Sequence, residues 1–341
     1  MAVTLQQIAD KAGVSRGTVD RALKERGRIN PEVAAKIRKI ADEMGYQPNR
    51  AGRALAMAKH SIKIGIIIQS METPFMQGVL EGAKDAKQEV ERLGATVTIK
   101  KISELDSDKV IAAMHKMKES GYNGIGLVAS DDEKLAHTID RFTEEGISVV
   151  TFNSDAAGTK RMCFIGQNAG QSGRTAAGLM AEILPDNAVV QVIAGYASNQ
   201  SHKERAEGFI NELNHCRPDV KLPGIRYAYD NDRAAAEITQ EVLKEHKELN
   251  GIYLAASGAK GVCQVIGEKG FKGSVKVISN DITDSNIESL KNGTLQFILG
   301  QDAYSQGYRP VMVLFDKLFD GKDPEEEYQY TEIVIKTKYN I

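Results

Sequence analysis

From Ser61 to the C-terminus, short apolar segments alternate with longer amphipathic segments. Nine apolar segments have the length of a strand, among them IKIGIII (62–68), GIGLVA (124–129) and VKVIS (275–279). Helix-like stretches lie between most of them, for example at 75–93, 132–145 and 168–184. This alternation predicts parallel sheets with helices on both faces. Because the strands are too many for one ordinary sheet, we expect two doubly wound lobes.

The first 60 residues differ in charge from the rest of the chain. They contain 12 Lys and Arg against 6 Asp and Glu, whereas the remainder contains 32 against 40, within an overall net charge of −2. A basic segment attached to an acidic body is typical of a nucleic-acid-binding domain joined to a second domain.

The basic segment carries local signals for three short helices. Thr4 and Gln7 have the spacing of a capping box, which predicts a helix directly after Thr4. Gly13 permits a tight turn, and Ser15 can cap a second helix. Pro31 fits the first position of a third helix. Two helices joined by a tight turn, followed by a packing helix, form the helix-turn-helix arrangement, so we expect an all-α DNA-binding domain.

The second helix places cationic side chains opposite its apolar residues. Arg16 at its start can donate two hydrogen bonds to a guanine edge, worth roughly 1–3 kcal/mol of discrimination, and Gly17 leaves room for close approach. Arg21, one turn later, is expected to read a base or hold a phosphate. Asp20 is expected to pair with Arg16 or Lys24, or to accept a hydrogen bond from cytosine. The residues placed for phosphate contacts are Ser15, Thr18, Arg28 and Asn49. A helical bundle without a DNA role is the alternative interpretation.

Two stretches, TLQQIADKAGVSRGTVDRAL (4–23) and EMGYQPNRAGRALA (43–56), resemble the DNA-binding headpiece of the LacI/GalR family of bacterial transcription regulators. The resemblance implies a headpiece at 1–48 and a hinge helix with linker at 49–60. It also implies that Leu55 enters the minor groove of operator DNA, where an apolar wedge kinks the duplex. Asp20 and Gly52 depart from the family pattern. The expected DNA contacts are Thr4, Ser15, Arg16, Gly17, Thr18, Asp20, Arg21, Arg28, Asn49 and Leu55.

The sequence lacks the motifs of the enzyme classes that use similar folds. The first strand of the second domain runs into QSMETPF, without the glycines of a dinucleotide site, and no Walker motif is present. The six histidines show no pair at metal-ligand spacing, and the three cysteines suit neither a disulfide framework nor a zinc site. We therefore expect no catalytic centre, cofactor or metal. Without a signal peptide or membrane span, we expect a cytoplasmic protein.

Residues 62–336 resemble the type-I periplasmic-binding-protein fold, with sugar-binding members such as the ribose-binding proteins nearest in pattern. The resemblance implies an effector-binding and dimerisation domain at 61–341 and a chain that crosses between its lobes three times. We place the crossings near 160, 290 and 322. Lobe one is then about 61–160 and 293–322, and lobe two about 161–292 and 323–341.

The resemblance also implies a ligand in the cleft between the lobes. The matching positions are Thr73, Phe75, Met76, Phe152, Asn153, His202, Arg205, Asp281 and Gln301. Such side chains suit a polyol, because carboxylates and amides accept from hydroxyls, arginine donates in pairs and aromatic faces cover C–H edges. Alternatives make Phe152 part of the sheet core, Asp281 a helix cap and His202 and Lys203 solvated. If His202 and Lys203 instead point inward, they favour a phosphorylated or acidic ligand.

Together these features predict a homodimeric regulator that binds double-stranded operator DNA and responds to a small effector, expected to be a monosaccharide or sugar derivative. The expected action is repression that the effector relieves, with corepression as the alternative sign. A solute-binding protein of a sugar uptake system and a nucleotide-dependent α/β enzyme are the competing classes. The basic headpiece opposes the first, and the missing phosphate loop opposes the second.

Overall fold

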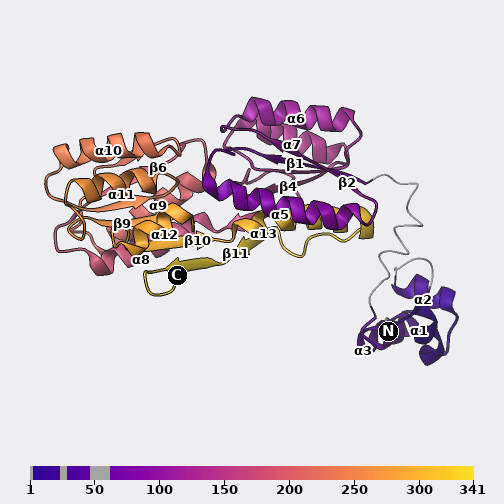
Figure 1. Cartoon of the computed structure of the whole chain (residues 1–341). Coiled ribbons are helices and arrows are strands. Elements are labelled where there is room, and N and C mark those ends of the chain that lie inside the picture. Colours follow the sequence, from indigo (N-terminus) through magenta and orange to yellow (C-terminus); the bar gives the residue numbers. More distant parts are fainter. Residues whose placement is uncertain (1–2, 24–28, 47–61) are drawn as a thin grey trace. The chain divides into compact units, whose positions relative to one another are not determined.

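The computed structural model describes residues 3–23, 29–46 and 62–341 of the chain, which Figure 1 draws in colour. The chain divides into two compact units, Met1–Lys59 and His60–Ile341. The first contains the headpiece, and the second is called the two-lobed domain below. Expected contacts Arg28, Asn49 and Leu55, and the hinge segment at 49–60, lie outside the described residues.

The headpiece contains three helices, α1 (Leu5–Ala12), α2 (Arg16–Leu23) and α3 (Pro31–Glu43). The capping box is present, since the backbone N–H of Gln7 donates to Thr4 Oγ1 over 3.3 Å and that of Thr4 donates to Gln7 Oε1 over 2.8 Å. Gly13 turns the chain with φ 71°, and Ser15 Oγ accepts the N–H of Thr18 over 3.1 Å. Local sequence signals therefore define all three helices. Their core comprises Ile8, Ala9, Ala12, Val19, Ala22, Ala34, Ile37, Ile40 and Ala41.

Two sheets of the same winding order form the two-lobed domain. The first has the order β11-β5-β4-β3-β1-β2 with every neighbouring pair parallel, and the second has the order β12-β10-β9-β8-β6-β7, in which only β12 is antiparallel to its neighbour. The expected doubly wound fold is confirmed. The strands of the first sheet are β1 (Lys63–Ile68), β2 (Thr96–Lys101), β3 (Gly124–Leu127), β4 (Ser148–Phe152), β5 (Cys163–Gln167) and β11 (Tyr328–Thr331). Those of the second are β6 (Val189–Ala194), β7 (Ile225–Tyr227), β8 (Leu249–Leu254), β9 (Lys276–Asn280), β10 (Phe297–Gln301) and β12 (Ile333–Lys336).

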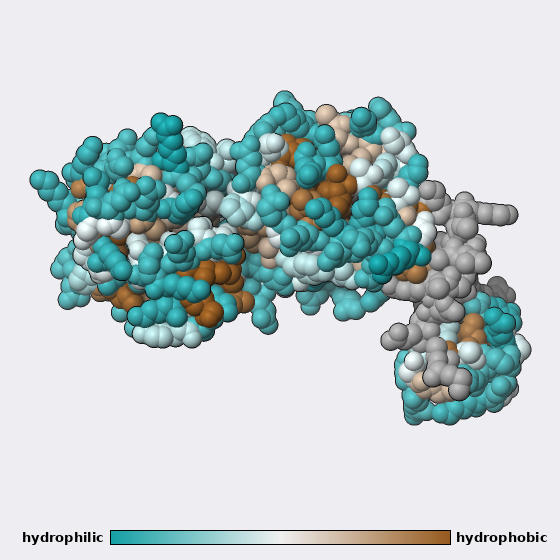
Figure 2. Space-filling view, in the orientation of Figure 1, coloured by the Kyte–Doolittle hydropathy of each residue, from teal (hydrophilic) through white to brown (hydrophobic). Residues whose placement is uncertain are grey.

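Helices cover both faces of each sheet (Figure 1). In the first lobe α5 (Pro74–Glu91) packs with α13 (Ala303–Asp320), and α6 (Ser107–Glu119) packs with α7 (Glu133–Glu144). In the second lobe α8 (Ala169–Ile183) packs with α9 (Gln200–Cys216), and α10 (Asp232–Glu245) and α12 (Asp284–Lys291) each pack with α11 (Ala259–Glu268). No helix in the described ranges combines the length and the apolar character needed to span a bilayer, and the face in Figure 2 is mostly hydrophilic.

Glycine sets the close approach of α5 and α13. A Cβ on Gly307 would lie 1.8 Å from the carbonyl oxygen of Val79, and a Cβ on Gly82 would lie 2.0 Å from that of Tyr304. Both contacts are with backbone, so no side-chain rotation could relieve them. The glycine pair thus fixes α13, which begins directly after strand β10.

The chain crosses between the sheets later than the sequence indicated. Strand β5 pairs with β4 in the first sheet, so the first crossing follows Gln167 rather than residue 160. Strand β10 pairs with β9 in the second sheet, and the second crossing follows Gln301 rather than 290. The third lies between β11 and β12, near 332 rather than 322. The first lobe therefore includes β5 and β11. The sequence did not assign these strands correctly, because the sheet to which a strand belongs depends on partners remote in sequence.

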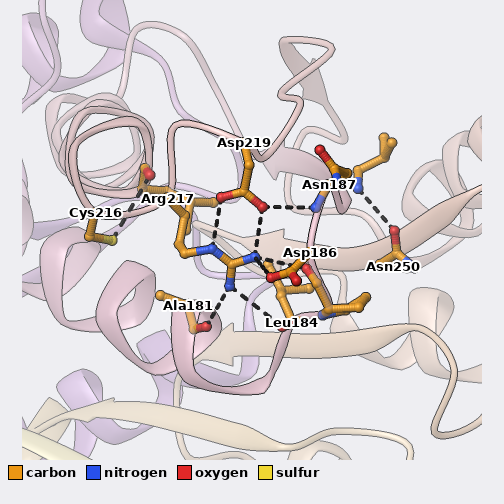
Figure 3. Close-up of polar contacts among 11 residues, drawn as sticks. Ala181, Leu184, Asp186, Asn187, Cys216, Arg217, Asp219 and Asn250 are labelled. Atoms are coloured by element: carbon orange, nitrogen blue, oxygen red, sulfur yellow. Dashed lines mark hydrogen bonds and ion pairs between the residues drawn. The ribbon is translucent and has the colours of Figure 1, made fainter.

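Polar contacts of Arg217 hold the C-terminal end of α9 in place (Figure 3). The Arg217 guanidinium donates to both carboxylate oxygens of Asp219, over 2.9 and 2.8 Å, and to the carbonyl oxygen of Ala181 over 3.0 Å. Asp219 also accepts the N–H of Asn187 over 2.8 Å. These bonds hold the pKa of the Asp219 carboxyl well below its usual range. They tie α9 to the end of α8 and the loop before β6, so the helix is held at one end while its other end faces the cleft.

Candidate functional site

The exposed side of α2 carries the side chains expected to contact DNA. Ser15, Arg16, Gly17 and Arg21 are exposed, whereas Val19 and Ala22 on the same helix are buried against the other helices. Arg21 Nε donates to the carbonyl oxygen of Gly17 over 3.1 Å, which extends its side chain along the helix surface. An exposed helix with two arginines one turn apart has the dimensions and charge to enter a major groove.

The remaining expected contacts in the described headpiece border this surface. Thr4 is exposed at the start of α1, and Thr18 is half-buried, with its hydroxyl 2.9 Å from that of Ser15. Asp20 is half-buried, and its charge contributes to raising the pKa of Tyr46, an effect caused mainly by burial. Asp20 therefore lies close enough to Tyr46 for its charge to act on the phenol.

A polar cavity lies where the carboxyl ends of strands from both sheets meet. It receives residues that follow β1, β3 and β4 of the first lobe and β7, β8 and β9 of the second, together with the first turns of α5 and α9. Its volume is about 30 Å³, room for a water molecule or two. A sugar therefore requires the lobes to move apart. The lining residues are Ser70, Thr73, Phe75, Met76, Val128, Asn153, Asn199, Ser201, His202, Arg205, Asp230, Ser257, Asp281 and Gln301.

Eight of the nine expected ligand residues line this cavity, and Phe152 does not. Phe152 is fully buried at the end of β4, and its ring lies 3.6 Å from where a Cβ on Gly126 would stand. Its side chain therefore points into the sheet core, as the alternative interpretation held. The next residue, Asn153, lies beyond the end of β4, adopts φ 64° and lines the cavity, so the backbone turn at Asn153 separates the two neighbours.

Side-chain hydrogen bonds within each lobe hold the amide and carboxylate groups at the cavity, and one bond of the Ser201 hydroxyl crosses between the lobes. Gln301 Nε2 donates to Asp281 Oδ1 over 2.7 Å, and Asn153 Nδ2 donates to Gln306 Oε1 over 3.0 Å. Ser201 Oγ, on α9 of the second lobe, donates to the carbonyl oxygen of Asn153 over 2.8 Å. Burial raises the pKa of Asp281, partly offset by the charge of Arg205. Asp281 is not a helix cap, because α12 is capped by Thr283.

His202 and Arg205 point inward from α9, whereas Lys203 does not. Both inward side chains are almost fully buried; Lys203 is half exposed, with its Nζ 3.8 Å from Asp131 of the first lobe. His202 Nδ1 accepts the N–H of Tyr196 over 3.2 Å, and burial lowers the pKa of the imidazole. Arg205 Nη1 makes one long bond of 3.4 Å to Ala255, and Nε has no hydrogen-bond partner among the described residues. A buried donor without a partner is costly, which points to a ligand that accepts from it.

Strained backbone marks the same strand ends. Six described residues other than glycine have positive φ angles; Asn187 lies in the loop before β6, and the other five line the cavity or lie next to it, namely Ser70, Asn153, Tyr229, Asp230 and Asp281. Each such conformation costs of order 1 kcal/mol or more in an ordinary residue and is retained where function over-determines the structure. The strain therefore places polar side chains into the cleft.

Six lining residues were not identified from the sequence: Ser70, Val128, Asn199, Ser201, Asp230 and Ser257. Ser70 lies two residues after β1 and Asp230 three residues after β7. Because ligands of parallel α/β sheets bind at the carboxyl ends of strands, their positions in the sequence could have indicated both residues. Ser257 lies three residues after β8 and also reaches the cavity. Asn199 and Ser201 lie in the first turn of α9, and only the folded packing of this helix brings them to the cleft.

A helix-turn-helix unit joined to a two-lobed domain with a buried polar cleft defines a class of transcription regulators that bind a small ligand. Residues 4–49 match the family of bacterial regulatory proteins named lacI, and residues 64–323 match the periplasmic binding protein domain. The chain therefore belongs to the lacI family of regulators built on a periplasmic-binding-protein domain, and both resemblances noted in the sequence are confirmed.

Relatives divide between regulators and solute-binding proteins. The transcriptional regulator RegA of Clostridium saccharobutylicum is 23% identical over 298 residues, 87% of this chain and 80% of that protein. MalR of Staphylococcus xylosus is 40% identical over 85 residues, 24% of this chain and 25% of that protein. The fructose import binding protein FruE of Bifidobacterium longum is 25% identical over 255 residues, 72% of this chain and 76% of that protein. The glucose-galactose binding protein GanP of Geobacillus stearothermophilus superposes with a TM-score of 0.76 at 22% identity, covering 83% of this chain and 99% of that one; this likeness concerns the fold.

Proposed function

We propose that this protein is a cytoplasmic repressor that binds a palindromic operator as a homodimer and leaves it when a sugar or related small polar metabolite enters the cleft. The observation that carries the proposal is that one chain has both an exposed arginine surface on α2 and a cleft in which the buried Arg205 Nε has no partner among the described residues. The first feature suits DNA, and the second suits a ligand with hydroxyl oxygens.

Ligand binding in the cleft changes the separation of the lobes. The cavity is too small for a sugar as it stands, and bonds such as Ser201 to Asn153 cross between the lobes. A ligand that replaces these bonds stabilises a different lobe spacing. We propose that this spacing sets the distance between the two headpieces of a dimer, and with it the fit to half-sites one helical turn apart. Such coupling is typically about 1–3 kcal/mol and acts equally in both directions.

The contacts proposed for DNA are Arg16 and Arg21 with base edges or phosphates, and Thr4, Ser15, Gly17, Thr18 and Asp20 at the rim of this surface. Arg28, Asn49 and the minor-groove residue Leu55 complete the proposal from outside the described residues. The contacts proposed for the ligand are Thr73, Phe75, Met76, Asn153, His202, Arg205, Asp281 and Gln301, with the newly found cavity residues beside them.

Fluorescence anisotropy tests the proposal. Short palindromic duplexes with central CG steps are titrated with the protein in the presence and absence of monosaccharides and sugar phosphates. Sequence-specific binding that a sugar weakens supports the repressor, and binding that requires the ligand reverses the sign to corepression. Ligand binding without specific binding to any duplex supports a solute-binding protein, the class of FruE and GanP.

A further inference from the structure

The charged groups of the cleft all come from one lobe. The first lobe contributes side chains without formal charge: Ser70, Thr73, Phe75, Met76, Val128 and Asn153. The second lobe contributes two carboxylates, Asp230 and Asp281, with Arg205 and His202. Among the described residues that line this cavity, a ligand therefore meets its charge partners on the second lobe.

His202 adds no positive charge to this group. Its Nδ1 accepts a hydrogen bond from the backbone N–H of Tyr196, which leaves the proton of a neutral imidazole on Nε2. Burial also lowers the pKa of His202. Arg205 is then the one cation among the described lining residues. The same lining contains two carboxyl groups, those of Asp230 and Asp281.

Asp230 is the carboxylate with unused hydrogen-bonding capacity. Its side chain is 8% exposed. Oδ1 accepts the N–H of Ser257 over 3.2 Å, while His202 Nε2 lies 3.9 Å away, beyond hydrogen-bond distance. Oδ2 accepts none of the hydrogen bonds given for the described residues and is not one of the fully buried atoms without a partner, so it is open to the cavity. A carboxylate that takes one backbone donor and is open to the cleft has capacity for a further donor, which a ligand can provide.

Two backbone features make room for the Asp230 side chain: a glycine at position 195 and the positive φ angle of Asp230 itself. A Cβ on Gly195 would lie 2.6 Å from both Asp230 Oδ1 and His202 Nδ1. Asp230 itself has φ 55°, a conformation that costs aspartate less than most residues. Its charge and that of Glu72 contribute to raising the pKa of Tyr196 at the edge of the cleft, an effect caused mainly by burial. The adjoining cavity contains Glu72 and Asp232 together with Arg233 and Lys260.

We propose that the effector carries a protonated amino group that binds Asp230, in addition to hydroxyls that reach Arg205 and Asp281. This inference rests on the proposed sugar-binding function and narrows its ligand class to amino sugars or amino polyols. An ammonium group offers three donors and compensates a buried carboxylate, whereas a hydroxyl leaves its charge in place. A phosphate or carboxylate on the ligand would face two carboxylates in a desolvated site, so the inward position of His202 does not favour an acidic ligand here.

Isothermal titration calorimetry on the full chain tests the amino group directly. The probes are 2-amino-2-deoxy-D-glucose and 2-amino-2-deoxy-D-galactose, each compared with its parent sugar, its N-acetyl derivative and its 6-phosphate. We expect at least one amine to bind tenfold or more tightly than its parent and N-acetyl forms. We expect D230N to lose this preference while retaining the fold, because asparagine tolerates the same backbone conformation. D232N removes an exposed carboxylate two residues away and should keep the preference.

Several outcomes overturn the proposal. They are an amine that never exceeds its neutral parent by tenfold, tighter binding of a 6-phosphate, or a preference that survives in D230N. If a neutral or phosphorylated sugar still changes operator binding in the anisotropy assay, the proposed amino group on the effector is refuted, while the proposed repressor function stands. If no sugar of any kind changes operator binding, the repressor proposal fails as well. Circular dichroism of D230N and D232N separates loss of the amine contact from loss of folding.

Discussion

Replacing Ile37 by alanine tests whether the headpiece is a separate folding unit that alone carries DNA binding. Ile37 is fully buried in the small core formed by α1, α2 and α3. Removing such a side chain costs about 2–5 kcal/mol. A domain of this size rarely has more than about 3–5 kcal/mol of stability. I37A is therefore expected to remove most or all of the stability of the headpiece.

The two-lobed domain has its own core, so its stability and its ligand affinity should be unchanged in I37A. Hydrogen exchange measured by mass spectrometry reports on peptides from α1 to α3 separately from those of the two-lobed domain. We expect the headpiece peptides to lose protection and operator affinity to fall at least tenfold. I37V, which costs about 0.5–1.5 kcal/mol, should keep both.

I139A is the matched control, because Ile139 is fully buried in α7 of the first lobe. It should weaken protection in the two-lobed domain and leave the headpiece peptides unchanged. The claim that the headpiece folds separately and carries DNA binding is refuted if I37A keeps operator affinity within twofold, or if I37A reduces protection throughout the two-lobed domain.

Three further substitutions test other parts of the account. R16A should reduce the preference for operator over scrambled DNA by about 1–3 kcal/mol, as measured by anisotropy, whereas equal losses on both duplexes would make Arg16 a phosphate contact. F152A should destabilise the two-lobed domain by about 3–5 kcal/mol in urea unfolding and leave ligand affinity within threefold; a large selective loss of affinity would return Phe152 to the cleft. R217Q should lower stability near neutral pH, where the depressed pKa of Asp219 makes its carboxylate stabilising. Because this contribution is present above the ordinary aspartate pKa and is lost as pH falls through the folded value, the difference between R217Q and the natural chain should shrink below about pH 4. A difference that is constant with pH would assign the effect of Arg217 to its bonds with backbone carbonyls.

Local signals explain why the headpiece could be predicted closely from the sequence. The capping box of Thr4 and Gln7, the left-handed Gly13 and the cap at Ser15 act within four residues, so they define the same elements in sequence and structure. The family resemblance likewise predicted that Asn153, Arg205 and Asp281 face one cavity, and the structure brings them together there; Asn153 and Asp281 follow parallel strands, whose carboxyl ends share an edge.

The sequence predictions were wrong or incomplete where the structure depends on contacts between segments remote in sequence. Strand β5 has no alternation that reveals its partner, and only its register with β4 assigns it to the first lobe. Asp230 follows a strand of three residues, and its place in the cleft depends on a positive φ angle and on Gly195, directly after the neighbouring strand β6. Phe152 and Asn153 are adjacent in sequence, yet only the backbone turn between them decides which one faces the ligand.

The most direct test of the central claim is operator binding as a function of effector concentration in a single titration series. A palindromic operator is first selected from random duplexes with the full protein, and anisotropy is then recorded while each sugar or amino sugar is added. We expect one ligand to lower operator affinity by about 5–150-fold, the range of typical allosteric coupling, and we expect this effect to disappear in R205M. An operator affinity that no sugar changes, or a change that persists in R205M, would contradict a cleft-gated repressor.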